Sequence, residues 1–127
     1  MNKLIIIGNL TRDPEIRDVS GVSVCTFTVA VNRRVKAGAH PEADYVRVTA
    51  WRGLADNCYK YLAKGRKVCV AGPARAYGYN GNDGSVRAYM ELTADDVEFL
   101  SARGRDDGEP PFEETDNSDV PEQFMDD

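Results

Sequence analysis

The sequence contains few metal-binding residues and no long apolar segment. It has three cysteines, one histidine and no Cys-x-x-Cys pair, so neither a zinc site nor a cofactor is expected, and the cysteines are predicted to be reduced thiols in a core. No run approaches the roughly 20 apolar residues that span a membrane. Strand-like sequence follows Met1-Asn2-Lys3 directly, without the pattern of a signal peptide. We therefore expect a soluble, cytoplasmic protein.

Basic residues are missing from the C-terminal segment. All 16 Lys and Arg lie at or before Arg105, whereas residues 106–127 contain 10 of the 21 Asp and Glu. The formal charge is therefore +5 for residues 1–105 and −10 for the remainder. A basic body with an acidic segment attached favours a nucleic-acid-binding domain followed by an interaction tail.

Most of the chain up to residue 100 is typical of β structure. Lys3–Leu10 is a nearly continuous apolar run, as expected of a strand buried on both faces. Val22–Asn32 is apolar at both parities and is predicted to be the second strand. Tyr45–Trp51, the third, alternates cleanly between two faces. Its core face is predicted to carry Val46, Val48 and Ala50, and its other face Tyr45, Arg47, Thr49 and Trp51.

The hydrophobic period changes after the third strand. Leu54, Cys58 and Leu62 recur at helical spacing, and Gly65 is placed to end a helix that we predict over Leu54–Lys64. This is the one helix that the pattern indicates.

Two further strands complete the predicted domain. They extend over Arg66–Tyr79 and Ser85–Phe99, joined by a hairpin at Asn80–Gly84, whose residues tolerate positive φ. Five strands with one helix between the third and fourth predict an all-β, five-stranded Greek-key barrel, the OB-fold. We assign residues 1–103 to this domain. Residues 104–127 are acidic and poor in apolar side chains, and are predicted to be a disordered tail for protein interaction.

The outer face of the third strand has the side chains that a single-strand binder needs. Tyr45 and Trp51 provide rings on which bases stack whatever their sequence, and Arg47 between them neutralises phosphate. Arg75, Tyr77 and Tyr79 share one parity on the fourth strand and extend the pattern. The full predicted DNA-binding set is Lys3, Arg12, Arg33, Arg34, Tyr45, Arg47, Trp51, Arg52, Arg75, Tyr77, Tyr79 and Arg87.

Some of these patterns have other interpretations. Tyr59 and Tyr61 are interpreted as surface or packing residues of the helix. Trp51 alone could be a core residue, but its parity with Arg47 favours the ligand face. Asp95 and Asp96 are adjacent, so on a strand they point to opposite faces, and no His or Cys accompanies them. We therefore expect a binding protein and not an enzyme.

Several short motifs occur together along about residues 1–103. They are Asn2-Lys3, Gly8-Asn9-Leu10, Asp13-Pro14-Glu15, Phe27-Thr28-Val29-Ala30-Val31, Tyr45-Val46-Arg47-Val48, Trp51, Leu54-Ala55, Tyr61-Leu62 and Lys64-Gly65. In this combination the domain resembles the bacterial single-stranded DNA-binding protein family.

The resemblance implies roles for particular residues. Trp51 matches a base-stacking aromatic residue of the family, and Tyr45 and Tyr79 match tryptophans, so a ring is kept at each. Val35 occupies a stacking position in the loop after the second strand, and Val46 occupies a subunit contact where the family often has histidine.

The resemblance also implies how the chain assembles and acts. It implies a homotetramer around which single-stranded DNA wraps during replication, recombination and repair, in the nucleoid. An acidic tail whose tip docks replication and repair proteins is implied as well. The family tip usually ends in Pro-Phe, whereas Pro121 is separated here from Phe124. The predicted partner-binding residues are Phe124, Met125, Asp126 and Asp127.

Two other functions fit parts of the pattern. An OB domain can serve as a protein adaptor, but an adaptor does not need Tyr45, Arg47 and Trp51 on one face. An RNA chaperone would use the same stacking chemistry, and no residue in the sequence identifies a reader of the 2′-hydroxyl.

Overall fold

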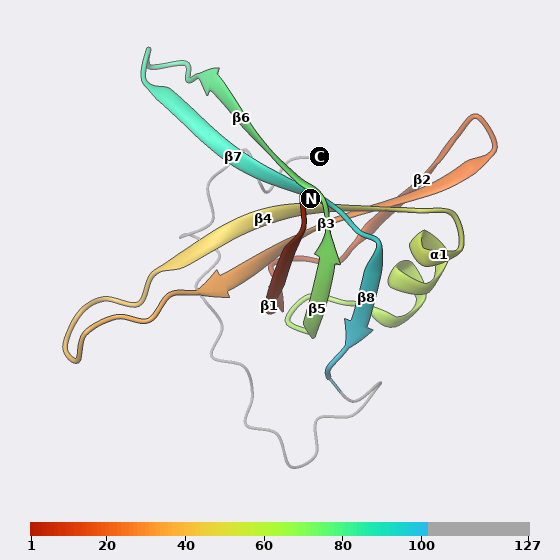
Figure 1. Ribbon diagram of the computed structural model, residues 1–127, viewed down its shortest axis with the longest axis horizontal. Coiled ribbons are helices and arrows are strands. Elements are labelled where there is room, and N and C mark those ends of the chain that lie inside the picture. Colours follow the sequence, from red (N-terminus) through yellow and green to blue (C-terminus); the bar gives the residue numbers. More distant parts are fainter. Residues whose placement is uncertain (102–127) are drawn as a thin grey trace.

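The computed structural model describes residues 1–101, which form eight strands and one helix. In Figure 1 the strands wrap into a barrel from which two hairpins and one long loop project. The elements are β1 (Leu4–Leu10), β2 (Glu15–Val19), β3 (Val22–Asn32), β4 (Ala43–Trp51), α1 (Arg52–Tyr61), β5 (Lys67–Gly72), β6 (Ala74–Asn80), β7 (Val86–Thr93) and β8 (Asp96–Phe99).

The pairing of the strands closes the barrel. β1 lies between β3 and β5 and is antiparallel to both, and β4 pairs with β3. β4 also pairs in parallel with β7, while β8 pairs with β5. Only Pro73 separates β5 from β6, and Ala94 and Asp95 separate β7 from β8, so each couple is one bent strand. With β2 as an extension of β1, the five strands match the predicted OB-fold.

The two bends pack against each other. The Thr93 N–H donates to the Pro73 carbonyl (3.0 Å), and the Asp95 N–H donates to the Ala71 carbonyl (2.8 Å). A Cβ on Gly72 would meet the backbone oxygen of Thr93, so only glycine allows this close approach. Beyond the bend, β6 and β7 leave the barrel as a long hairpin (Figure 1).

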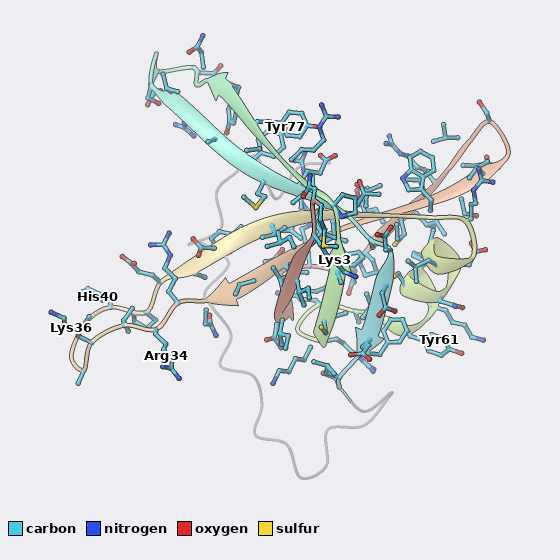
Figure 2. All side chains as sticks on the ribbon, in the orientation of Figure 1. Lys3, Arg34, Lys36, His40, Tyr61 and Tyr77 are labelled. Atoms are coloured by element: carbon cyan, nitrogen blue, oxygen red, sulfur yellow. The ribbon has the colours of Figure 1, made fainter. Side chains whose placement is uncertain are left out.

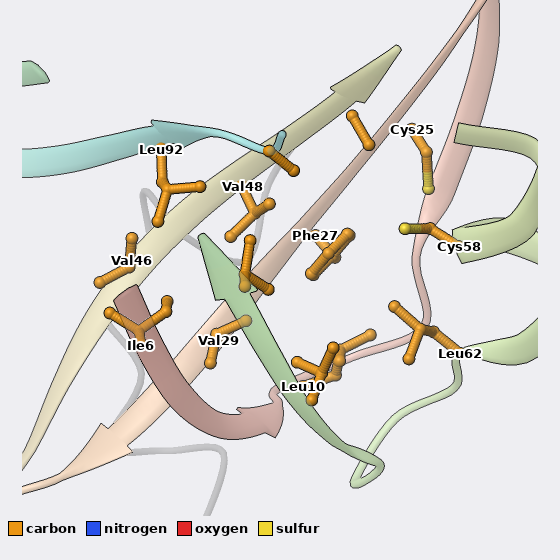
Figure 3. Packing of buried hydrophobic residues seen from close by; sticks show 14 of the residues in the cluster. Ile6, Leu10, Cys25, Phe27, Val29, Val46, Val48, Cys58, Leu62 and Leu92 are labelled. Carbon is orange, nitrogen blue, oxygen red and sulfur yellow. The ribbon is translucent and has the colours of Figure 1, made fainter. Parts of the chain in front are cut away.

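The core follows the predicted alternation of β4. Val46, Val48 and Ala50 are buried, together with side chains from β1, β3, β5 and β7. Figure 3 shows Cys25 of β3 and Cys58 of α1 pointing toward one another where the helix covers one end of the barrel. Burial raises the pKa of the Cys25 thiol to about 11 and that of Cys58 to about 12. Both thiols are free and buried, as the sequence predicted, whereas Cys69, which was also expected in the core, is free but only partly buried.

Helix α1 begins and ends earlier than predicted. It starts at Arg52 and ends at Tyr61, not at Lys64. The Lys64 N–H donates to the Asp13 carboxylate (2.9 Å), and the Gly65 N–H donates to the Leu10 carbonyl (2.9 Å). These tertiary hydrogen bonds take up the amides that a longer helix would use.

Two other features of the strands differ from the prediction. Strand β2 was missed, because Glu15–Val19 is almost entirely exposed and lacks an apolar alternation. It pairs with β3 through a tight turn at Ser20 and Gly21, both of which have positive φ. β1 is not buried on both faces, since Ile5 and Ile7 are exposed. The predicted tail, residues 104–127, lies outside the described residues.

Candidate nucleic-acid interface

The outer face of β4 carries the polar and aromatic side chains that the sequence predicted there. Arg47 and Thr49 are partly exposed and Trp51 is exposed, whereas Val48 between them is fully buried. Pairing with β3 on one side and with β7 on the other fixes the position of this strand in the barrel. Tyr45 immediately precedes Val46, the first β4 residue that pairs with β7.

Aromatic rings from the β6–β7 hairpin gather beside this face. Tyr77 and Tyr89 are opposite each other in the ladder, and their rings stack with centroids 5.1 Å apart and an interplanar angle of 16°. Tyr79 meets the Tyr89 ring edge-on at 5.9 Å. The Arg47 guanidinium lies 5.2 Å from the Tyr89 centroid, and that of Arg75 lies 5.6 Å from the Tyr77 centroid. Tyr77 is labelled on this hairpin in Figure 2.

We call these five residues, Arg47, Arg75, Tyr77, Tyr79 and Tyr89, the aromatic cluster. Each guanidinium lies over a ring at a distance typical of cation–π attraction, and it adds positive charge to the cluster. The three tyrosines are partly exposed, and rings of this kind are the surfaces on which nucleobases stack. The Tyr79 hydroxyl is buried and has no hydrogen-bond partner among residues 1–101. The cluster is therefore suited to planar, anionic ligands.

A groove of about 750 Å³ continues from the aromatic cluster toward the far end of β4. Trp51 and Tyr59 line it, with side chains that are 43% and 52% exposed. Arg17 of β2 and Arg47 of β4 also line it. Its remaining wall consists of Pro14, Glu15, Ile16, Val24, Thr26, Thr49 and Glu91.

The long loop between β3 and β4 contributes a different arrangement of charge. Arg33 donates hydrogen bonds to Asp44 (2.6 Å) and to Glu42 (3.2 Å) across the base of the loop. The hydrogen bond from Arg33 to Asp44 lowers the pKa of the Asp44 carboxyl. Arg33 is therefore engaged within its own loop, whereas Arg34 and Lys36 extend outward near the tip (Figure 2).

Other residues of the predicted set lie apart from the aromatic cluster. Lys3 shares its side-chain direction with Ile5 and Ile7 on the outside of β1, which β3 separates from β4. Arg12 follows β1, and Arg52 begins α1. Arg87 pairs with Asp83 at the hairpin turn (3.5 Å). Phe124, Met125, Asp126 and Asp127 lie outside the described residues.

Two residues with clear positions in the site were not predicted. Tyr89 is the centre of the aromatic cluster, and its shared parity with the predicted Arg87 was a signal that could have found it. Tyr59 was interpreted as a surface or packing residue, yet it lines the groove with Trp51. By contrast, Tyr61 packs against Phe99 with ring centroids 5.6 Å apart.

Residues 1–100 match the single-strand binding protein family. The chain belongs to that family. It is 36% identical over 132 residues to single-stranded DNA-binding protein 2 of Clostridium acetobutylicum, an alignment that covers 95% of this chain and 99% of that protein. It is 41% identical over 105 residues to single-stranded DNA-binding protein 3 of Listeria innocua, covering 81% and 66% of the two chains. It is 38% identical over 111 residues to single-stranded DNA-binding protein 1 of Staphylococcus aureus, covering 86% and 71%.

Residues 1–101 of this member of the single-strand binding protein family contain neither a cluster of metal ligands nor a helix that could span a membrane. No group of three or more His, Cys, Asp or Glu side chains is arranged to hold a metal ion in that part of the chain. No helix there is long and apolar enough to cross a membrane.

Proposed function

We propose that this protein binds and protects single-stranded DNA without regard to sequence during replication, recombination and repair. The observation that carries the proposal is the convergence of the aromatic cluster on the outer face of β4, in a chain of this family. Stacking accepts every base, because each base has a π-face, and contributes about 1–3 kcal/mol per base. A binding role of this kind requires no catalytic group.

The contact residues divide between stacking and charge in this proposal. Trp51 and the tyrosines of the aromatic cluster stack bases, with Tyr45 beside them. Arg34, Lys36 and Arg52 are exposed and reach phosphates. Lys3 and Arg12 lie apart from the aromatic cluster and would meet phosphates farther along the DNA strand. Arg33 is paired with Asp44 and Arg87 with Asp83, so both contribute less to phosphate binding.

We also propose that the protein assembles as a homotetramer. The outside of β1 exposes Ile5 and Ile7, and the paired residues on β5 are Ala71 and Cys69. An apolar sheet face of this kind favours association with a second copy. Light scattering coupled to gel filtration tests this, since a mass near the 14.0 kDa of one chain contradicts it.

The acidic segment recruits replication and repair proteins in this proposal, and the protein acts in the cytoplasm at the nucleoid. Support comes from its charge of −10 and from the apolar pair Phe124 and Met125 among carboxylates. A pull-down compares the full chain with Phe124→Ala and with a chain ending at Arg105. Equal partner recovery from all three contradicts the recruitment role.

The binding proposal is tested by titration with oligo(dT). Trp51 is the one tryptophan of the chain, so its fluorescence reports on the groove directly. We expect quenching by single-stranded DNA and little change with duplex DNA of equal length. Unchanged emission with all nucleic acids overturns the proposal. Tighter binding to oligo(U) than to oligo(dT) identifies an RNA-binding protein instead. A protein that binds no nucleic acid in this titration but recovers partner proteins in the pull-down is an adaptor.

A further inference from the structure

Tyr59 is an exposed aromatic side chain that the fold does not use. It lies on α1 and is 52% exposed. Within residues 1–101 it makes no ring stack, cation–π contact or side-chain hydrogen bond, whereas its neighbour Tyr61 packs on Phe99. An exposed aromatic ring without a packing role indicates a ligand-binding site when it lies in a concave part of the surface.

Tyr59 lies in such a site, together with Trp51. Both line the groove of about 750 Å³ that β2, the end of β4 and α1 enclose. α1 packs against β2, β3 and β4, and Figure 1 shows it at the same end of the barrel as the β2–β3 hairpin. The helix begins directly after Trp51, so the two rings come from consecutive elements whose relative position is fixed.

The groove has the chemistry that a nucleotide requires. Its two aromatic rings offer stacking surfaces, and Ile16 and Val24 add apolar wall. Arg17 lies on β2 at the rim, where it can meet a phosphate. Arg47 belongs both to this groove and to the aromatic cluster, so the two surfaces are continuous along β4.

We propose that Tyr59 and Trp51 form a second nucleobase-binding site, in which the DNA strand passes from the aromatic cluster along β4 and onto α1. Tyr59 stacks a base there, and Arg17 contacts the adjoining phosphate. This inference rests on the proposed binding of single-stranded DNA and adds α1 and β2 to the contact surface.

The test uses the full chain and three α1 variants, titrated with an oligo(dT) of about 16 nucleotides, the upper end of the range for one OB domain. We expect Tyr59→Ala to weaken binding at least about 5-fold, the lower limit for loss of one stacked base. Tyr59→Phe keeps the ring and is expected to bind like the wild type. Asn57→Ala, also exposed on α1, is the matched control and is expected to have no effect.

Two further measurements separate stacking from other roles. The salt dependence of binding is expected to be the same for Tyr59→Ala and the wild type, because the ring neutralises no phosphate. Arg17→Ala is expected to reduce that dependence. The midpoint of urea unfolding is expected to be unchanged by Tyr59→Ala, since the side chain is exposed.

The outcomes distinguish this inference from the function on which it rests. Tight binding by both the wild type and Tyr59→Ala overturns the inference and leaves single-strand binding intact. Equal losses in Tyr59→Ala and Tyr59→Phe also overturn it, because the hydroxyl and not the ring would then be responsible. A wild-type protein that does not bind oligo(dT) overturns both.

Discussion

Tyr89 is the residue whose removal affects the aromatic cluster most. Its ring contacts Tyr77, Tyr79 and Arg47, each with centroid distances between 5.1 and 5.9 Å. Tyr89→Ala removes one stacking surface, which contributes about 1–3 kcal/mol to binding of a base. It also removes two aromatic pairs, each worth about 0.5–1.5 kcal/mol to folding. We therefore expect binding to weaken by about 5-fold to 150-fold and stability to fall by about 1–3 kcal/mol.

The two effects are measured separately. Fluorescence anisotropy of a labelled oligo(dT) gives the dissociation constant, and urea unfolding gives the free energy of unfolding. Met90→Ala is the matched control, because Met90 is the next residue of β7 and points to the other face. Its truncation is expected to leave DNA binding near the wild-type value.

A double-mutant cycle then tests the cooperation within the cluster. If Tyr77 and Tyr89 act as one stacked unit, the double variant loses less binding energy than the sum of the single losses. Tyr89→Ala that stays folded and binds oligo(dT) as tightly as the wild type would refute the reasoning, because the central ring would then have no role in the interface.

Three other predictions follow from the structure. Arg47→Ala is expected to reduce the slope of log K against log salt by about 1, measured by titration at several salt concentrations, and an unchanged slope shows that Arg47 meets no phosphate. A Cβ on Gly8 would lie against the backbone of β3, so Gly8→Ala is expected to lower the free energy of unfolding by about 1–3 kcal/mol. A Cβ on Gly53 of α1 meets open space, so Gly53→Ala is expected to raise it by about 0.5–1 kcal/mol. Equal midpoints of urea unfolding for the two variants contradict this. The pKa values of Cys25 and Cys58 are raised to about 11 and about 12, so their contribution to stability is complete below pH 9 and is lost as pH rises through those values. Cys58→Ala is expected to flatten this decline of the free energy of unfolding with pH, measured by urea unfolding. A decline as steep as that of the wild type contradicts the prediction.

Features of the fold that depend on local pattern were predictable from the sequence. The alternation of β4, the helical spacing in α1 and the turn after β6 each occupy a few consecutive residues, and each is present. The exposure of Ile5 and Ile7 was not predictable, because an apolar run is the same whether it packs in its own core or is left on the outside. The end of α1 was missed because hydrogen bonds from Lys64 and Gly65 reach residues about 50 positions away.

The candidate site was predictable only where parity along a single strand identifies it. Arg47, Tyr77 and Tyr79 were found in this way, while Tyr59 needed the position of α1 relative to β2.

Tyr89 depends on the register of the β6–β7 hairpin, which a difference of one residue in the turn decides. A turn centred on Asn82, the middle of the predicted hairpin, would pair Tyr77 with Arg87. The observed register is centred on Asp83 and pairs Tyr77 with Tyr89 instead. Moving the centre by one residue moves each partner by two, so the same face of β7 remains in place but a different side chain lies opposite. The turn residues after β6 therefore decide whether Tyr77 stacks on a ring or contacts a cation, and the Asp83 carboxylate that accepts from Ser85 (2.6 Å) stabilises the turn that gives the ring.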